Sequence, residues 1–186
     1  MFKDNLSKLS YQNFYVSKEE SNSPLIPQIV KTGKTLKKLG ITKDAVVSLK
    51  YGKRVLINAK NTKLDELKRE DFLEIVDFDP LKNVLLLIGP KESKIDSSNH
   101  WMIHHARDDV NAVIQIVNNS IAEKLAKKIP TTENERDPGS FELTKEILGK
   151  IRDSKKVVVR NQGVFFVGHS LIEAEEILLK TYEEIQ

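Results

Sequence analysis

Short apolar segments that come in pairs around turns constrain this chain most strongly. The first pair, 45–49 and 54–59, flanks the turn Tyr51-Gly52-Lys53, and the second pair, 72–76 and 84–88, flanks a proline-containing turn. Each pair is typical of a β-hairpin, whose two strands are antiparallel. Further on, a strand is expected at 111–117, and another strand pair within 157–167 surrounds Asn161-Gln162-Gly163.

Helices are expected between and after these strands. The segments with helical spacing, or compatible with it, are 25–39, 97–107, 120–128, 141–151 and 171–185. Because helices flank hairpins instead of alternating with single strands, the order predicts an α/β fold with three layers, α/β/α, around a mainly antiparallel central sheet. We expect one domain over residues 1–186, in which residues 1–24 form an N-terminal arm.

Composition excludes several classes of protein. The chain has 186 residues, of which 39% are hydrophobic and 31% charged, as in soluble globular domains. A net charge of +3 is too small for a dedicated nucleic-acid binder, and the lack of cysteine excludes disulfides, thiolate ligands and cysteine nucleophiles. No segment approaches the ~18 apolar residues of a membrane span, and the N-terminus lacks a signal-peptide pattern, so we expect a cytoplasmic protein without membrane contact.

Two histidines could bind a metal ion by their spacing alone. His100 and His104 lie four residues apart on the expected helix 97–107, and Asp96 lies four residues before His100. Histidines at this spacing share one helix face and can chelate one ion. Asp96 and His104 would lie about 12 Å apart along the helix axis, too far to share that ion. The pattern therefore favours a polar, partly buried helix face.

Two segments resemble the zinc-bearing segments of the class II aldolase and adducin family. Residues 157–164, VVVRNQGV, followed by 168–174, GHSLIEA, are similar to the family patterns V-L-L-x-N-H-G-V and G-x-S-x-x-E-A. Residues 109–113, DVNAV, are similar to D-x-N-A-V in the middle segment. The resemblance runs from about Ile29 to Glu184 and implies a domain similar to L-fuculose-phosphate aldolase.

In this alignment each zinc histidine of the family is replaced. Gln115 and Val117 stand at the two histidines of the middle segment, and Gln162 stands at the third. Glutamine is a weak neutral ligand and valine is none, so we expect no metal and no other cofactor.

The same ungapped alignment assigns two candidate catalytic residues. Asp96 stands at the family's catalytic glutamate, which moves the proton next to a carbonyl, and His100 stands at a family histidine. An alternative alignment with one gap puts Asn99 at the glutamate position and loses the His100 match.

The phosphate-binding segments that the resemblance implies are also altered. Ser48 ends the segment that aligns with the family's G-N-x-S, Lys60 and Asn61 replace a T-G pair, and Lys94 with Ile95 replaces a serine pair. Loss of glycine restricts the close approach of backbone amides to a phosphate. Lysines can still attract an anion as point charges, so we consider these four residues candidates for anion binding: Ser48, Lys60, Asn61 and Lys94.

Two hypotheses for the function remain open. The first, which the sequence favours, is a catalytically degenerate protein, or pseudoenzyme, that binds a small anion or a protein as a scaffold; the adducin branch is a precedent by resemblance. The second is a metal-independent or altered-metal aldehyde-lyase or isomerase for a small sugar phosphate, with Asp96 as base and His100, His104 or Gln162 polarising a carbonyl. The resemblance also implies a homo-oligomer, with a tetramer as the expected form.

Overall fold

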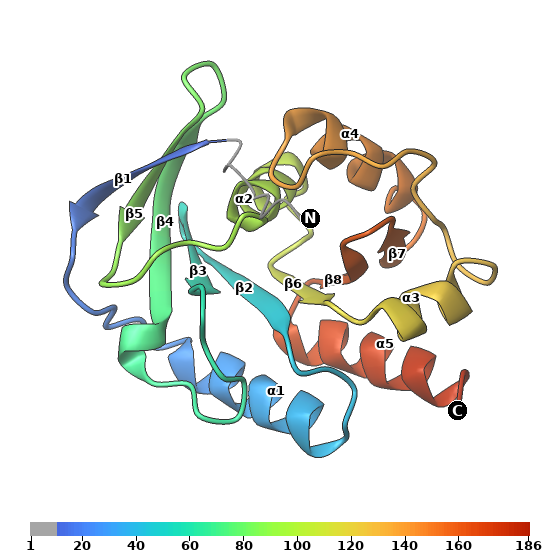
Figure 1. Ribbon diagram of the computed structural model, residues 1–186. Coiled ribbons are helices and arrows are strands. Elements are labelled where there is room, and N and C mark those ends of the chain that lie inside the picture. The colour runs from blue at the N-terminus through green and yellow to red at the C-terminus, as the bar shows by residue number, and fades with distance from the viewer. Residues whose placement is uncertain (1–10) are drawn as a thin grey trace, which may run out of the picture.

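A computed structural model describes residues 11–186 as helices packed around one eight-stranded sheet (Figure 1). The strand order is β1-β5-β4-β3-β2-β6-β8-β7. The strands are β1 (Gln12–Ser17), β2 (Ala45–Tyr51), β3 (Arg54–Asn58), β4 (Phe72–Asp79), β5 (Val84–Ile88), β6 (Ala112–Ile116), β7 (Lys156–Val159) and β8 (Gly163–Gly168). The helices are α1 (Ile26–Lys38), α2 (Ser97–Ala106), α3 (Asn119–Leu125), α4 (Phe141–Lys150) and α5 (Leu171–Glu183), with a short 3₁₀ turn at Arg69–Asp71.

The sheet is mixed, because its first two strands run parallel. β1 pairs with β5 in a parallel register that places Phe14 opposite Leu86. The other neighbouring pairs, from β5–β4 through to β8–β7, are antiparallel. The expected hairpins β2–β3 and β4–β5 are both present, and left-handed residues turn them, with φ of +59° at Gly52 and +52° at Asn83.

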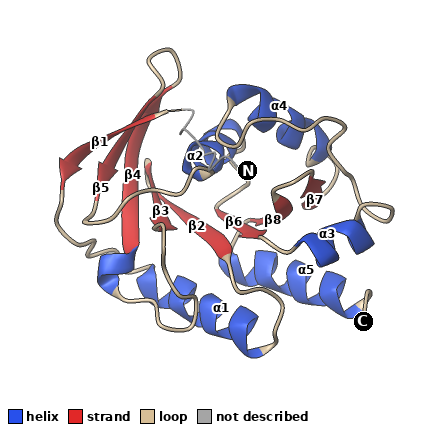
Figure 2. Ribbon diagram, viewed as in Figure 1, coloured by secondary structure: helices blue, strands red, loops and turns tan. Residues whose placement is uncertain are grey.

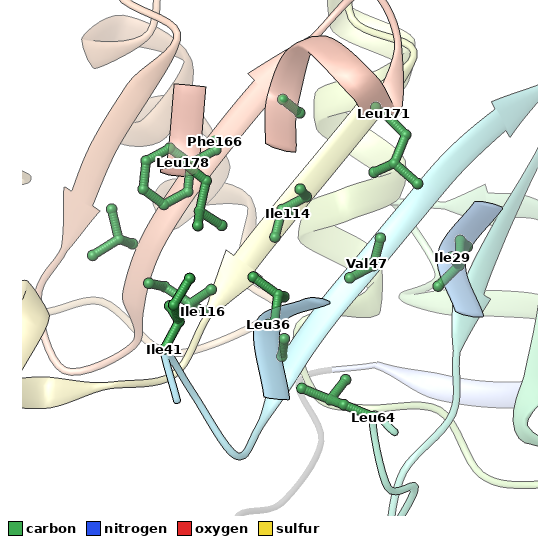
Figure 3. Close-up of a cluster of buried hydrophobic side chains, with 14 of the residues drawn as sticks. Ile29, Leu36, Ile41, Val47, Leu64, Ile114, Ile116, Phe166, Leu171 and Leu178 are labelled. Atoms are coloured by element: carbon green, nitrogen blue, oxygen red, sulfur yellow. The ribbon is translucent and has the colours of Figure 1, made fainter. Parts of the chain in front are cut away.

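Helices cover both faces of the sheet, which confirms the three-layer α/β/α prediction (Figure 2). On one face α1, α3 and α5 enclose the largest apolar cluster, in which Leu36 and Leu178 pack with Val47, Ile114 and Phe166 (Figure 3). On the other face, α2 and α4 share an apolar cluster with β6, β7 and β8, and α2 also contacts β3 and β4. Alternate residues of β2 and β6 therefore point to opposite layers.

The N-terminal arm expected over residues 1–24 is replaced, in its described part, by strand β1. Residues 12–17 form the outermost strand of the sheet, while residues 1–10 lie outside the described residues. Tyr11, which directly precedes β1, holds the loop after β5, because its hydroxyl donates to the carbonyl oxygen of Lys94 over 2.5 Å. The arm is thus part of the sheet.

The two edges of the sheet differ. At the β7 edge, the amide of Val158 donates to Pro130, and Thr132 donates back to the carbonyl of Val158. This short parallel bridge occupies backbone groups that a free edge strand would present. At the other edge, the side chains of Phe14 and Val16 on β1 are 59% and 56% exposed.

Candidate functional site

A fully buried pair of histidines joins α2 to the sheet. His100 and His104 share one face of α2, and the hydroxyl of Ser48 on β2 lies between them, 2.7 Å from Nδ1 of His100 and 2.8 Å from Nε2 of His104. All three side chains are completely buried. Nδ1 of His104 contacts the carbonyl oxygen of Val110 at 3.2 Å. The polar helix face predicted from the spacing is therefore a structural contact between helix and sheet.

The same hydrogen-bonded chain reaches the positions that align with the family's zinc ligands. Nε2 of His100 lies 3.0 Å from Oε1 of Gln115, and Nε2 of Gln115 donates to the carbonyl oxygen of Gln162 over 3.2 Å. The side chain of Gln162 in turn donates to the carbonyl oxygen of Arg136 over 3.1 Å. The structure thus brings His100, Gln115 and Gln162 together.

This series of hydrogen bonds lacks one hydrogen when both imidazoles are neutral. Its five contacts, from the carbonyl of Val110 to the carbonyl of Gln162, each require one hydrogen. Two neutral imidazoles and the Ser48 hydroxyl supply one each, and the amide of Gln115 supplies one at only one of its two ends. Exchanging the oxygen and nitrogen of the Gln115 amide moves the missing hydrogen to another contact but does not supply it. One contact is therefore unprotonated, or one imidazole takes up an additional proton.

Burial opposes that additional proton. It lowers the pKa of His100 to about 4, although the contact with Gln115 acts in the opposite direction. Burial also lowers the pKa of His104 to about 3, and the neighbouring His100 adds to this effect. Both rings are consequently neutral at physiological pH, so one of the five contacts lacks a hydrogen.

Asp96 lies at the N-terminus of α2 without capping it. An aspartate at this position commonly accepts a hydrogen bond from the first turn, but the Asp96 side chain makes no such bond. The side chain is 9% exposed, and its Oδ1 atom is buried without a hydrogen-bond partner. Burial raises the pKa of this carboxyl to about 6, and the nearby Gln115 amide and Lys94 oppose the shift. A buried carboxylate with a pKa near 6 is suited to acid–base chemistry.

A polar cleft of about 410 Å³ opens beside Asp96. It lies between the loops that follow β3 and β5 and the residues that precede β2. Its lining consists of lysines, other polar side chains and one isoleucine: Lys43, Asp44, Lys60, Asn61, Thr62, Ser93, Lys94, Ile95 and Asp96. The expected anion-binding residues Lys60, Asn61 and Lys94 thus lie together, and in the same cleft as the expected base.

Ser48 does not belong to this cleft, contrary to the sequence-based expectation. Its side chain is fully buried between the two histidines, so it cannot contact a ligand in the cleft. Lys94 is also partly engaged, because its Nζ atom contacts Oδ1 of Asp44 at 2.5 Å and the carbonyl of Ala45 at 3.1 Å. Lys60 is exposed and lies 3.8 Å from a carboxylate oxygen of Glu92.

Several residues of the site were not predicted from the sequence. Lys43, Thr62 and Ser93 line the cleft, and Ser93 is held by two side chains near the start of β1. Its hydroxyl donates to Oδ1 of Asn13 over 2.9 Å and lies 3.1 Å from the hydroxyl of Tyr11. The one local signal is the Lys60-Asn61-Thr62 turn, where Asn61 adopts a φ of +58°.

The donor set at the positions that the sequence alignment matches to the family's zinc ligands does not fit zinc. Both ends of the Gln115 amide are used within the chain of hydrogen bonds, and Val117 has no donor atom. The side chain of Val117 is 39% exposed just beyond β6. Of the three residues at these positions, only Gln162 has a buried oxygen without a hydrogen-bond partner, its Oε1. Within residues 11–186, no three His, Cys, Asp or Glu side chains are grouped so that they could hold a metal ion.

This mixed sheet between two helical layers is a class II aldolase-like fold. The model of the Class II Aldolase and Adducin N-terminal domain matches residues 27–116. This match assigns residues 27–116 of the chain to the class II aldolase and adducin family. No match is found among curated protein sequences.

Solved structures of aldolases share this fold at low sequence identity. An L-fuculose 1-phosphate aldolase superposes with a TM-score of 0.73 at 16% identity, over 89% of this chain and 84% of the other. The L-fuculose-1-phosphate aldolase of Thermus thermophilus gives 0.69 at 17% identity, over 89% and 94%. A sugar-phosphate aldolase of Thermotoga maritima gives 0.66 at 18% identity, over 86% and 92%. At these identities the likeness concerns the fold.

Proposed function

We propose that this protein is a catalytically degenerate member of its family that binds a small anion in the cleft beside Asp96 and does not catalyse zinc-dependent aldol cleavage. The composition of the cleft carries the proposal. Lys43, Lys60 and Lys94 face the same space as Asn61, Thr62 and Ser93, which offer hydrogen-bond donors to an anion's oxygens. Three cations and several neutral donors are suited to a phosphate or carboxylate group.

The lysines differ in how freely they can bind. Lys94 is paired with Asp44, whereas Lys43 and Lys60 are exposed, and the contact of Lys60 with Glu92 is long. Lys43 and Lys60 are therefore the main charges available to an anion. Because a lysine on a flexible stem is a point charge without a fixed fork of donors, we expect weak binding, with a Kd on the order of 1 mM for a bare anion.

The loss of zinc donors supports the second half of the proposal. In a zinc-dependent aldol cleavage the metal stabilises the enediolate, a contribution worth several kcal/mol of the barrier. The positions that would hold the ion carry Gln115, Val117 and Gln162, and the two glutamine amides are instead used to connect α2 with the sheet and the segment around Arg136. On this proposal the fold of the site is retained, while the glutamines that replace its zinc ligands connect structural elements.

Calorimetric titration with inorganic phosphate at low ionic strength tests anion binding. We expect Lys43→Ala and Lys60→Ala each to weaken binding by about two- to fivefold, the effect of losing one exposed charge pair of about 0.5 to 1 kcal/mol. Lys53→Ala is the matched control, because Lys53 is an exposed lysine in the β2–β3 turn outside the cleft. Absence of phosphate binding, or equal weakening by all three changes, would contradict the proposal.

A second function is favoured by Asp96 itself. A carboxylate with one buried, unpartnered oxygen, facing a cleft and with its pKa raised to about 6, has the properties of a general base. In this alternative the protein is a metal-independent lyase or isomerase, in which Asp96 removes a proton next to the carbonyl of a small sugar phosphate.

Proton exchange separates the two functions. Dihydroxyacetone phosphate incubated with the protein in D₂O should exchange a carbon-bound hydrogen, seen by NMR, if Asp96 acts as base. Asp96→Asn should abolish the exchange, while Asp44→Asn, which removes a carboxylate from the same cleft, should leave it measurable. Lack of exchange in the unmodified protein would eliminate this alternative and retain the anion-binding scaffold.

We also propose that the protein is a single-domain cytoplasmic homo-oligomer, with the tetramer implied by family resemblance as the expected form. The exposed apolar side chains Phe14 and Val16 on the β1 edge support self-association. No helix of the described part of the chain is long and apolar enough to cross a bilayer.

A further inference from the structure

The polar groups that precede Asp96 in the loop after β5 are bonded to other acceptors. The hydroxyl of Ser93 donates to Oδ1 of Asn13 over 2.9 Å. The hydroxyl of Tyr11, which reaches this loop, donates to the carbonyl oxygen of Lys94. The ammonium group of Lys94 is itself paired with a different carboxylate. The loop therefore places several donors close to Asp96 and directs them elsewhere.

Asp96 is thus a buried carboxyl group with few donors around it. Its side chain is 9% exposed, and among residues 11–186 its Oδ1 atom has no hydrogen-bond partner. The hydroxyl of Ser97, the next residue, is also buried without a partner. Nε2 of the nearby Gln115 donates to the carbonyl oxygen of Gln162. A buried carboxylate in such surroundings is stabilised by a hydrogen, either its own or one supplied by a ligand.

The cleft that Asp96 lines contains charges of both signs. Lys43 and Asp44 precede β2, Lys60 follows β3, and Lys94 follows β5. The contact of Asp44 with Lys94 at 2.5 Å offsets one charge of each sign. An anion attracted by Lys43 and Lys60 therefore meets Asp96 as the carboxylate that no lysine pairs with in the cleft wall.

Two further titratable groups near Asp96 are neutral near pH 7. Burial raises the pKa of Tyr11, which precedes β1, so its phenol keeps its hydrogen. Burial lowers the pKa of His100, one turn further along α2, to about 4. Burial also raises the pKa of Asp96 itself to about 6, against the effects of the Gln115 amide and Lys94. The charge of Asp96 therefore changes between about pH 5 and 7.5.

We propose that Asp96 determines which anions the cleft binds: near neutral pH its carboxylate accepts a hydrogen bond from the anion, so oxyanions that carry a hydrogen bind and fully ionised ones do not. Hydrogen phosphate can donate this bond while its other oxygens accept from Lys43 and Lys60. Sulfate has the same tetrahedral shape but no hydrogen, so its oxygens would meet the Asp96 carboxylate with like charge. The inference rests on the proposed anion binding and names the class of anion.

The size of the discrimination follows from the unpaired group. A site that forms a hydrogen bond with its ligand rejects an analogue that cannot form it, because the protein group is then left without a partner. At about pH 7.5 we expect phosphate to bind at least about tenfold more tightly than sulfate.

Acid should remove this discrimination, because a protonated Asp96 can donate to either anion. With a pKa of about 6, its protonated fraction rises about thirtyfold between pH 7.5 and 5. Sulfate binding should therefore strengthen at least about tenfold over this interval. Phosphate carries a hydrogen at both pH values, so its affinity should change less.

Amide NMR titrations with sodium phosphate and sodium sulfate, at constant low ionic strength, measure both Kd values at the two pH values. Asp96→Asn is the test variant. Its amide has donors for either anion, so the two affinities should come within about twofold of each other at both pH values. Asp44→Asn removes a carboxylate from the same cleft and is the matched control. It should strengthen the binding of both anions alike and keep the preference for phosphate.

The outcomes separate this inference from anion binding in general. A preference for phosphate that disappears on acidification and in Asp96→Asn supports it. Equal affinities of the unmodified protein for the two anions at about pH 7.5, or a preference that Asp96→Asn retains, overturn it while anion binding stands. If neither anion binds at either pH, the proposed function fails as well. Should the amide spectrum show that Asp96→Asn does not fold, the unmodified protein decides: sulfate binding that does not strengthen with acid overturns the inference.

Discussion

At the scale of single residues, the buried series of hydrogen bonds from Val110 to Gln162 couples the choice of protonated nitrogen in His104 to that in His100. If the missing hydrogen lies at one of the two Gln115 contacts, Nδ1 of His104 is the protonated nitrogen, because the carbonyl oxygen of Val110 can only accept. Nε2 of His104 then accepts from Ser48, whose oxygen accepts in turn from His100. The position of the missing hydrogen thereby determines the direction of this series of hydrogen bonds.

This direction can be observed directly. ¹⁵N NMR of the imidazoles at pH 7 should show His104 neutral and protonated on Nδ1. His169 is the internal comparison, because its Nδ1 accepts from the Asn111 amide at the surface and should lack the proton. An Nε2-protonated His104 would contradict the chain as described.

The glycine of the Asn161-Gln162-Gly163 turn is required by space as well as by conformation. Gly163 has a φ of +109°, and a Cβ placed on it would lie 1.9 Å from the carbonyl oxygen of Ile116. We expect Gly163→Ala to lower the free energy of unfolding by about 3 kcal/mol or more. Gly149→Ala, in α4 with no atom within 4 Å of the added carbon, should instead raise it by about 0.5 to 1 kcal/mol. Denaturant unfolding measures both, and equal effects would disprove the steric explanation.

The sequence predicted some members of the site and missed others for a physical reason. Gln115, Gln162, Asp96 and the two cleft lysines follow from alignment with family motifs that lie in continuous segments. The role of Ser48 could not be predicted, because burial between His100 and His104 depends on how α2 packs on β2. Side chains of Ser93 and Lys43 enter the cleft only because distant loops meet there.

At the scale of elements, β1 shows the limit of local patterns. Hairpins β2–β3 and β4–β5 were predicted because each is encoded by two strands and the turn between them. β1 pairs with β5 in parallel, across about 70 residues of chain. Such a pair has no short connecting turn from which the pairing could be predicted. Its outward residues are exposed, so the segment also lacks a continuous apolar pattern.

β1 should nevertheless affect the cleft. The Tyr11 hydroxyl is bonded to Lys94 and Ser93 in the loop that forms one wall. We expect Tyr11→Phe to destabilise the protein by about 1 to 2 kcal/mol, the effect of a lost buried hydrogen bond, and to weaken phosphate binding by loosening that wall. Tyr51→Phe, at an exposed position at the end of β2, is the matched control. Unfolding and phosphate titration provide the two measurements; an unchanged affinity would separate β1 from the site.

At the scale of the whole molecule, the buried titratable groups determine how stability depends on pH. His100 and His104 have pKa values of about 4 and 3 in the folded protein, below the ordinary 6.5, so the unfolded chain takes up protons that the folded one refuses. Stability is therefore lost as the pH falls below about 6.5. Asp96 acts oppositely, because its pKa is raised from 3.8 to about 6 and the folded state retains its proton.

Two histidines outweigh one aspartate in this balance. With about 1.4 kcal/mol per pH unit for each group, the free energy of unfolding should fall by about 3 kcal/mol between pH 6.5 and 4.5. Asp96→Asn removes the opposing contribution, so the free energy of unfolding of this variant should fall further over the same pH interval. Guanidinium titrations at the two pH values measure this, and stability that is level or rises on acidification would refute the assignment of both histidines as buried and neutral.

The bridge between the 130–132 segment and β7 limits where a further strand can pair with this sheet. Since Pro130 and Thr132 already occupy backbone groups of Val158, a further strand cannot be added there without displacing them. Addition is possible beside β1, whose outer backbone groups face no strand of residues 11–186. We expect inserted strands, fused strands and fibrillar growth to add to the sheet at β1. Charged or proline substitutions in that strand should therefore oppose amyloid-type assembly.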